Sequence, residues 1–266
     1  MDERRIALRL AYDGTKFFGF QRQPGRVTVE GSLMVALAKI GAIRSPRECG
    51  YRSSSRTDRG VSSLGNVVSI RTDFLVGSIC SAVNSELEDV WALSSVEVPD
   101  DFNPRAARQR WYRYYLPKSD QDLDVMKELA QRFAGVHDFS GYSRKDKRNP
   151  MRKIDAIEIS DAGMFYALDF KAESFLWNMV RRIVWMVNEG SAGRMPLDSI
   201  GPTASKKPAR IGLAPPEYLV LMNIDCGVEF KVDGRARIGI ARTIERSLRE
   251  TGMRLMFSED LLHLLG

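Results

Sequence analysis

The sequence of 266 residues predicts an α+β fold. In the first hundred residues, segments with strand-like alternation and segments with helix-like apolar spacing follow the order strand, helix, strand, strand, helix, strand. This order is the ferredoxin-like, or split βαβ, arrangement. A hydrophobic content of 44% is enough to bury a substantial core, and the length suits one large domain or two small ones.

The first half of the chain begins with an alternating run, residues 6–12, which predicts a strand closed by an Asp-Gly turn. The aromatic and basic segment 16–23 predicts a loop. Thr28 is a suitable N-cap for a helix from Val29, because its hydroxyl can accept a hydrogen bond from the first turn. The remaining elements are expected as a strand at 66–72, a helix at 76–87 and a strand at 90–98.

The second half of the chain also mixes strands and helices. Strands are expected at 111–116, 154–160, 165–172 and within 213–226, and a helix at 123–133. A helix beginning near Ser174 has the cleanest amphipathic pattern of the chain and must pack on a sheet. In the tail, a helix is expected around 238–248, and Ser258 is a candidate cap for a last apolar turn.

Charge is the most informative part of the composition. The chain has 40 Lys and Arg against 34 Asp and Glu, a net charge of +6 and a pI near 9.3. Residues 101–153 hold thirteen Lys or Arg and seven Asp or Glu, which equals the whole excess. A local basic excess of this kind favours a polyanionic partner such as a nucleic acid.

Cysteine and histidine usage argues against a metal site. The three cysteines, Cys49, Cys80 and Cys226, are widely separated, and only two histidines are present, so a zinc site or a disulfide scaffold is not expected. The first residues are charged and then alternate, without the long apolar run of a secretory signal or a membrane span. We therefore expect a cytoplasmic protein that is not bound to a membrane.

A single carboxylate, Asp58, stands between Arg56 and Arg59 in the Ser, Thr and Gly-rich stretch 52–68. We expect the neighbouring cations to keep this carboxylate ionised. On residue types alone, a solvated turn is the simpler explanation of the stretch, because Asp followed closely by Gly is ordinary loop composition.

A basic and aromatic segment follows Phe102, and in the strand expected there Tyr112 and Arg113 belong to opposite rows. Such rows are usually core residues, but interleaved arginines favour RNA, since bases stack on aromatic rings and cations meet phosphates. Arg181, inside a largely apolar helix, either extends to solvent or pairs with an acid. The segment 144–153 is a solvated loop or a phosphate-contacting loop, with the candidates Arg144, Lys145, Lys147 and Arg148.

Several motifs in the same order resemble the TruA class of tRNA pseudouridine synthases. The motifs are YDGTKFFGFQRQ, SRTDRGVSSLGNVV, FNPRAARQRWYRYY, KAESFLWNMVRRIV and LAPPEYLVL, the last with Tyr218 where the family has Gly. Arg59 and Ser62 are similar to the archaeal and eukaryotic branch. The resemblance implies two ferredoxin-like halves that share a central, mainly antiparallel sheet flanked by helices.

The resemblance also implies boundaries and partners. Residues 1–105 would form the first half, 106–227 the second, and 228–266 a C-terminal extension that matches no motif. Family members usually form homodimers, bind tRNA in a basic cleft, and need neither a metal nor a nucleotide cofactor. Their target is a uridine in the anticodon arm, at tRNA positions 38–40.

Residue roles follow by position in the motifs. Asp58 would be the nucleophile, Tyr112 would stack on the target base, and Arg181 would pair with Asp58. Arg56 would fill the space left by the flipped uridine. The other expected RNA contacts are Arg22, Arg59, Arg113, Leu219 and the four basic residues named above within 144–148.

Two alternatives belong to other functional classes. A non-catalytic RNA-binding protein or tRNA chaperone on the same scaffold would lack the acid, whereas Asp58 is present. A nucleobase hydrolase would release free uracil. The motifs favour the isomerase over both.

Overall fold

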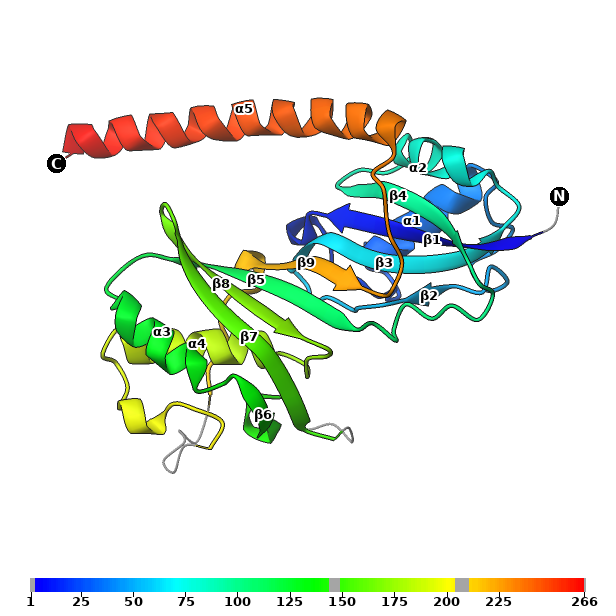
Figure 1. Cartoon of the computed structure of the whole chain (residues 1–266). Helices are drawn as coiled ribbons and strands as arrows, with labels where there is room; N and C mark the ends of the chain where they lie inside the picture. Colours follow the sequence, from blue (N-terminus) through cyan, green and yellow to red (C-terminus); the bar gives the residue numbers. More distant parts are fainter. Residues whose placement is uncertain (1–2, 144–148, 204–210, 266) are drawn as a thin grey trace.

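A nine-stranded sheet extends through the whole computed structural model, which describes residues 3–143, 149–203 and 211–265 (Figure 1). The strand order is β4-β1-β3-β9-β5-β8-β7-β6, with β2 paired to β3. The strands are β1 (Arg4–Tyr12), β2 (Arg52–Ser53), β3 (Ser62–Thr72), β4 (Val90–Val98), β5 (Gln109–Pro117), β6 (Gly135–Asp138), β7 (Met151–Ala162), β8 (Phe165–Ala172) and β9 (Leu219–Asp225). All neighbouring pairs are antiparallel except β3 with β9. The predicted α+β class is confirmed.

Helices pack on the two ends of the sheet and bury separate cores. Apolar side chains of α1 (Val29–Lys39) and α2 (Val76–Asn84) pack with those of β1, β3 and β4. Those of α3 (Leu123–Gln131) and α4 (Met179–Ser191) pack with β5, β7 and β8. In the strand order, β9 lies between β3, which packs in the first core, and β5, which packs in the second, so a site at that junction can draw on both halves of the sheet (Figure 1).

Helix starts show where local signals succeed and fail. Thr28 caps α1 as predicted, since its Oγ1 accepts a hydrogen bond from the backbone N–H of Gly31 at 3.2 Å. The prediction that a helix begins near Ser174 is wrong, because that helix, α4, starts at Met179. Asn178 has a φ of 64°, which a right-handed helix cannot accommodate.

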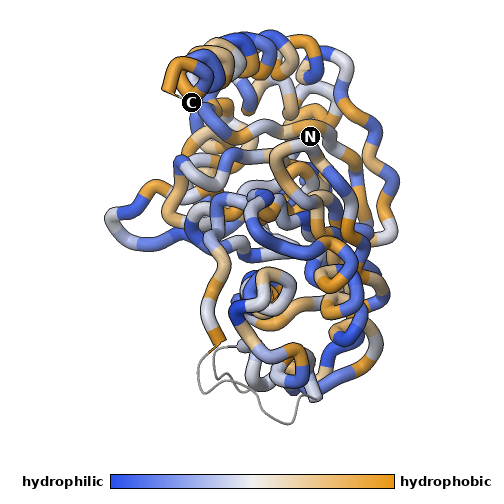
Figure 2. The backbone as a smooth tube through the Cα atoms, turned by 90° about the vertical axis from the view of Figure 1, so that its left-hand side faces the viewer, coloured by the Kyte–Doolittle hydropathy of each residue, from blue (hydrophilic) through white to orange (hydrophobic). Residues whose placement is uncertain are grey.

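The C-terminal segment is one long helix, α5 (Gly234–Leu265), which continues through the expected break. Ser258 is therefore not a cap: its Oγ donates to the carbonyl of Arg254 within the helix. Only the start of α5 contacts the body, where Ala236 is buried and β4 and α2 lie alongside. Figure 2 shows hydrophobic and hydrophilic residues alternating around this helix.

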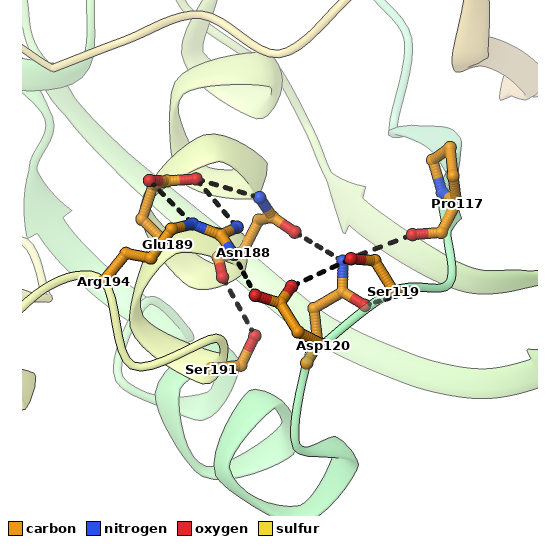
Figure 3. Close-up of polar contacts among 8 residues, drawn as sticks. Pro117, Ser119, Asp120, Asn188, Glu189, Ser191 and Arg194 are labelled. Atoms are coloured by element: carbon orange, nitrogen blue, oxygen red, sulfur yellow. Dashed lines mark hydrogen bonds and ion pairs between the residues drawn. The ribbon is translucent and has the colours of Figure 1, made fainter.

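The C-terminal end of α4 is held by a cluster of polar contacts (Figure 3). Arg194 contacts the carboxylates of Asp120 at 2.6 Å and Glu189 at 3.1 Å. Asn188 accepts a hydrogen bond from Gln121, which precedes α3, at 2.8 Å. Exposed ion pairs contribute little individually, but together these contacts fix α4 relative to the segment that leads into α3.

The part of the chain that the structure describes has neither a membrane-spanning helix nor a cluster of metal-binding side chains. None of its helices is long and apolar enough to span a membrane. It also contains no group of three or more His, Cys, Asp or Glu side chains that could hold a metal ion.

Candidate active site

A cavity of about 960 Å³ lies at the junction between the two halves of the sheet, beside β9 and β5. Its lining includes the loop between β2 and β3, the loop that contains residues 18–23, β5, the start of β9, and the segment that leads into α4 together with the first turn of that helix. Asp58, Tyr112 and Arg181, far apart in the sequence, all line it. The structure therefore brings together the three residues that the motifs singled out.

The loop that carries Asp58 is held by a buried polar network. Asn66, fully buried on β3, donates through Nδ2 to the Ser55 carbonyl at 3.0 Å and to the Tyr12 hydroxyl at 3.1 Å. Its Oδ1 accepts from the backbone N–H of Ser55 at 3.3 Å. The hydroxyls of Tyr12 and Thr57 lie 2.9 Å apart. These contacts fix the backbone on the N-terminal side of Asp58.

Glycines allow other segments to approach the same loop. Gly19 has a φ of +90°, and a Cβ there would lie 3.2 Å from both Thr57 O and Arg59 N. Gly60 has a φ of +87°, and its Cβ would lie 3.0 Å from Pro216 Cγ. Both positions need glycine, because L side chains rarely adopt such φ angles and the space is occupied.

The carboxylate of Asp58 has two different neighbours. Trp177 Nε1 donates a hydrogen bond to Oδ1 at 2.9 Å, and Arg181 Nη1 lies 3.8 Å from Oδ2. Burial raises the pKa of Asp58 above its ordinary value, and Trp177 and Arg181 only partly oppose this shift. Desolvation therefore outweighs the favourable charge of Arg181 in setting the direction of this shift, and the expectation that Arg56 and Arg59 keep the carboxylate ionised stays a prediction.

Arg181 points inward from the first turns of α4. Arg181 is only 9% exposed, so the alternative that its side chain extends to solvent is wrong. Arg181 Nε donates to the Ala214 carbonyl at 2.6 Å, which leaves one edge of the guanidinium toward Asp58. The chain after α4 thus anchors the counter-charge of the acid.

Tyr112 lies on β5 with its ring edge-on to Phe175, at a centroid distance of 5.4 Å. Burial raises the pKa of Tyr112 to about 12, against the opposing charge of Arg110. Its hydroxyl is consequently neutral near pH 7. Tyr114, two residues along the same strand, is fully buried in the core instead and does not line the cavity.

Some of the residues predicted to contact RNA line the cavity, and others do not. Arg56, Arg59 and Leu219 line it, and the guanidinium of Arg59 lies 4.1 Å from the centre of the Phe18 ring. Arg113 lies on the opposite face of β5 and pairs with Asp169 at 2.8 Å, while Arg22 pairs with Glu30 at 2.8 Å. Arg144, Lys145, Lys147 and Arg148 lie outside the described residues.

Sequence reasoning missed four residues of this site. Trp177, Arg105 and Arg110 line the cavity, and Arg110 Nε donates to Ser55 Oγ at 3.1 Å. Asn66 holds the Asp58 loop through its hydrogen bond to the Ser55 carbonyl. Arg105 and Arg110 stood among the interleaved arginines, and Asn66 and Trp177 lay within the motifs, but only the folded chain places them beside Asp58.

Comparisons with known proteins agree with the motifs. Residues 129–225 match the family described as tRNA pseudouridine synthase. Proteins named tRNA pseudouridine synthase A from Pyrococcus abyssi and Pyrococcus horikoshii are 42% and 43% identical to the chain over 266 and 251 residues. The alignments cover 98% of this chain and 100% of the first protein, and 92% and 94% for the second. The protein of that name from Methanothermobacter thermautotrophicus is 41% identical over 235 residues, 86% of this chain and 84% of the relative.

Proposed function

This chain belongs to the tRNA pseudouridine synthase family, and from that premise we propose that it isomerises uridine in the anticodon arm of tRNA, at positions 38–40, with Asp58 as the nucleophile. The family is one of isomerases, and its reaction has no net redox change. The finer assignments, to Asp58 and to the anticodon arm, rest on the motif positions and on the geometry of the cavity.

The composition of the cavity carries the proposal. Among the described lining residues, Asp58 is the one carboxylate, and the same lining includes five arginines: Arg56, Arg59, Arg105, Arg110 and Arg181. Glycoside hydrolysis generally uses two carboxylates, one of which activates a water or protonates the leaving group. A single acid in a cationic cavity instead suits a reaction in which the detached base is retained and an RNA backbone is bound.

In the proposed reaction, the Asp58 carboxylate acts as the N1–C1′ bond breaks. The base then turns, C5 bonds to C1′, C5 loses its proton and N1 gains one, so atoms and charge balance. The carboxylate can attack C1′, add to C6 or assist elimination at the sugar, and all three routes begin with the same side chain.

Tyr112 and Arg181 have supporting roles in this proposal. The ring of Tyr112 stacks on the uracil. Because its hydroxyl is neutral near pH 7, we assign stacking rather than proton abstraction as its main contribution. Arg181 holds the second oxygen of Asp58 within ion-pair distance, and Arg56 has the length and charge to enter the space that a flipped uridine leaves.

The test is Asp58→Asn assayed on unmodified tRNA, with pseudouridines mapped by carbodiimide treatment and primer extension. We expect loss of pseudouridine formation with tRNA binding retained, and no change in Asp101→Asn, whose carboxylate is exposed and away from the cavity. Full activity in Asp58→Asn would contradict the proposal. Wild-type protein that binds tRNA without modifying it would favour the RNA-binding alternative, and release of free uracil would favour the hydrolase.

We also propose that the chain forms a homodimer, and α5 supports this. Its residues Ile244, Leu248, Thr251, Leu255, Ser258, Leu262 and Leu265 repeat at alternating spacings of four and three. This is the spacing of a helix that pairs with another helix, and Leu248 and Leu262 are 64% and 69% exposed. Isolated helices are marginally stable in water, so an exposed row of this length calls for a partner.

Sedimentation of the full chain checks the dimer. Leu248→Glu combined with Leu255→Glu should convert a dimer to a monomer, whereas Arg246→Glu, on the opposite side of α5, should not. A wild-type monomer, or a double variant that remains dimeric, would contradict this role of α5.

Because tRNA is the proposed substrate, we further place the protein in the cytoplasm.

A further inference from the structure

Trp177 occupies an unusual place beside the acid. It immediately precedes Asn178, and the two residues form a turn before α4 in which the backbone N–H of Met179 donates to the Leu176 carbonyl at 3.1 Å. The indole lines the cavity and is 42% exposed, so it is neither a core residue nor a fully solvated one. The motif comparison gave Trp177 no role.

The contact of Trp177 with Asp58 is the shorter of the two that hold the carboxylate. The distance from Nε1 to Oδ1 is 2.9 Å, a normal hydrogen bond, whereas Arg181 Nη1 is 3.8 Å from Oδ2, beyond hydrogen-bond length. A hydrogen bond fixes the direction of a carboxylate, whereas an ion pair at that distance constrains it weakly. The orientation of Asp58 thus depends more on Trp177 than on the arginine.

We propose that Trp177 is a positioning residue, whose indole N–H holds Oδ1 of Asp58 so that Oδ2 is the oxygen presented for reaction. This inference rests on the proposed function of Asp58. The indole is suited to this task because it is a donor only, carries no charge, and has a large rigid ring that packing can orient.

The hydrogen bond from Trp177 should also affect the pKa of Asp58. A donor to the ionised carboxylate favours the charged form, so removal of the indole N–H should raise the pKa of Asp58 further above its ordinary value. Among the residues that the structure describes, the other charged or titratable groups lining the cavity are Arg181 on α4, Tyr112 and Arg110 on β5, Arg56 and Arg59 in the Asp58 loop, and Arg105. The pKa of Tyr112 is about 12, and Asp58 is the one carboxylate among the described lining residues, so we expect the acid limb of the rate profile to report on Asp58.

The decisive variant is Trp177→Phe, which keeps a ring and removes the donor. We expect kcat to fall about tenfold or more, with KM for tRNA changed by less than about twofold. The acid limb of the rate profile should move to higher pH. Trp185→Phe is the matched control, because Trp185 lies on α4, packs against Gly212 and does not line the cavity. Unchanged kcat and an unchanged acid limb in Trp177→Phe would overturn the proposal.

A second measurement is independent of catalysis. A protonated carboxyl group quenches a neighbouring indole, so the fluorescence of the wild-type protein minus that of Trp177→Phe should titrate with Asp58. Asp58→Asn should abolish the titration. If Trp177→Phe fails to fold, the comparison of wild type with Asp58→Asn still decides, and the same acid titration in both would refute the contact. If Asp58→Asn keeps its synthase activity while the titration is lost, the proposed nucleophile fails but the contact stands.

Discussion

Replacing Asn66 by Ala should separate the stability of the fold from the order of the catalytic loop. Asn66 is fully buried and makes three hydrogen bonds that reach across to Ser55 and Tyr12. Truncation leaves the N–H and the carbonyl of Ser55 without these partners in a buried position. A buried polar group left without a partner costs about 1–3 kcal/mol, and Tyr12 keeps its contact with Thr57. We therefore expect Asn66→Ala to lower the free energy of unfolding by about 3 kcal/mol.

The matched control is Asn84→Ala. Asn84, at the end of α2, also bonds to backbone groups, accepting from Ala92 N at 2.7 Å and donating to Ala92 O at 3.0 Å, but it lies away from the cavity. Urea unfolding should reveal losses of similar size in the two variants. At a temperature where both remain folded, only Asn66→Ala should lower kcat, because only its contacts fix the backbone before Asp58. Equal kcat values, or a loss below about 1 kcal/mol for Asn66→Ala, would refute this account of the network.

Three further predictions concern the site. Asp58→Asn should unfold at a higher urea concentration than wild type at pH 7. Because the native pKa of Asp58 is raised, its ionisation begins to cost stability as the pH rises above the ordinary value of about 3.8, and the cost is complete above the native pKa; the difference between the two proteins should therefore shrink as the pH falls toward that ordinary value. Tyr112→Phe should keep most tRNA affinity and turnover, whereas Tyr112→Ala should lose about 1–3 kcal/mol of binding measured by filter retention. Gly60→Ala should lower kcat because its Cβ meets Pro216, while Gly41→Ala, with a positive φ but no atom within 4 Å, should cost stability alone, as thermal melts would reveal.

Local patterns in the sequence predicted the elements well but not all of their ends. The Thr28 cap and the alternation of β8 depend on neighbouring residues, so the sequence contains the information. The start of α4 depends on the backbone of Asn178, whose left-handed φ no apolar spacing reveals. The unbroken length of α5 does not follow from local signals, because a serine that is typical of a cap, Ser258, instead donates its hydroxyl to a carbonyl within the helix.

The site was predictable only as far as the motifs extended. The alternation of β5 already separates Tyr112 from Arg113, and the structure puts Arg113 on the face away from the cavity. The hydrogen bond from Trp177 to Asp58 joins residues 119 positions apart, which periodicity cannot relate. The direction of the pKa shift of Asp58 also needed the folded chain, because burial outweighs the arginines that the sequence displays.

The position of β9 has a consequence for the timing of synthesis. This last strand lies between β3 and β5, and Leu221 is opposite both Ser63 and Tyr112. A ribosome delivers the Asp58 loop early, and N-terminal segments fold first, yet the loop cannot face Tyr112 until residues 219–225 have emerged. The cavity is therefore completed only after β9 has been made, when most of the chain has already been synthesised.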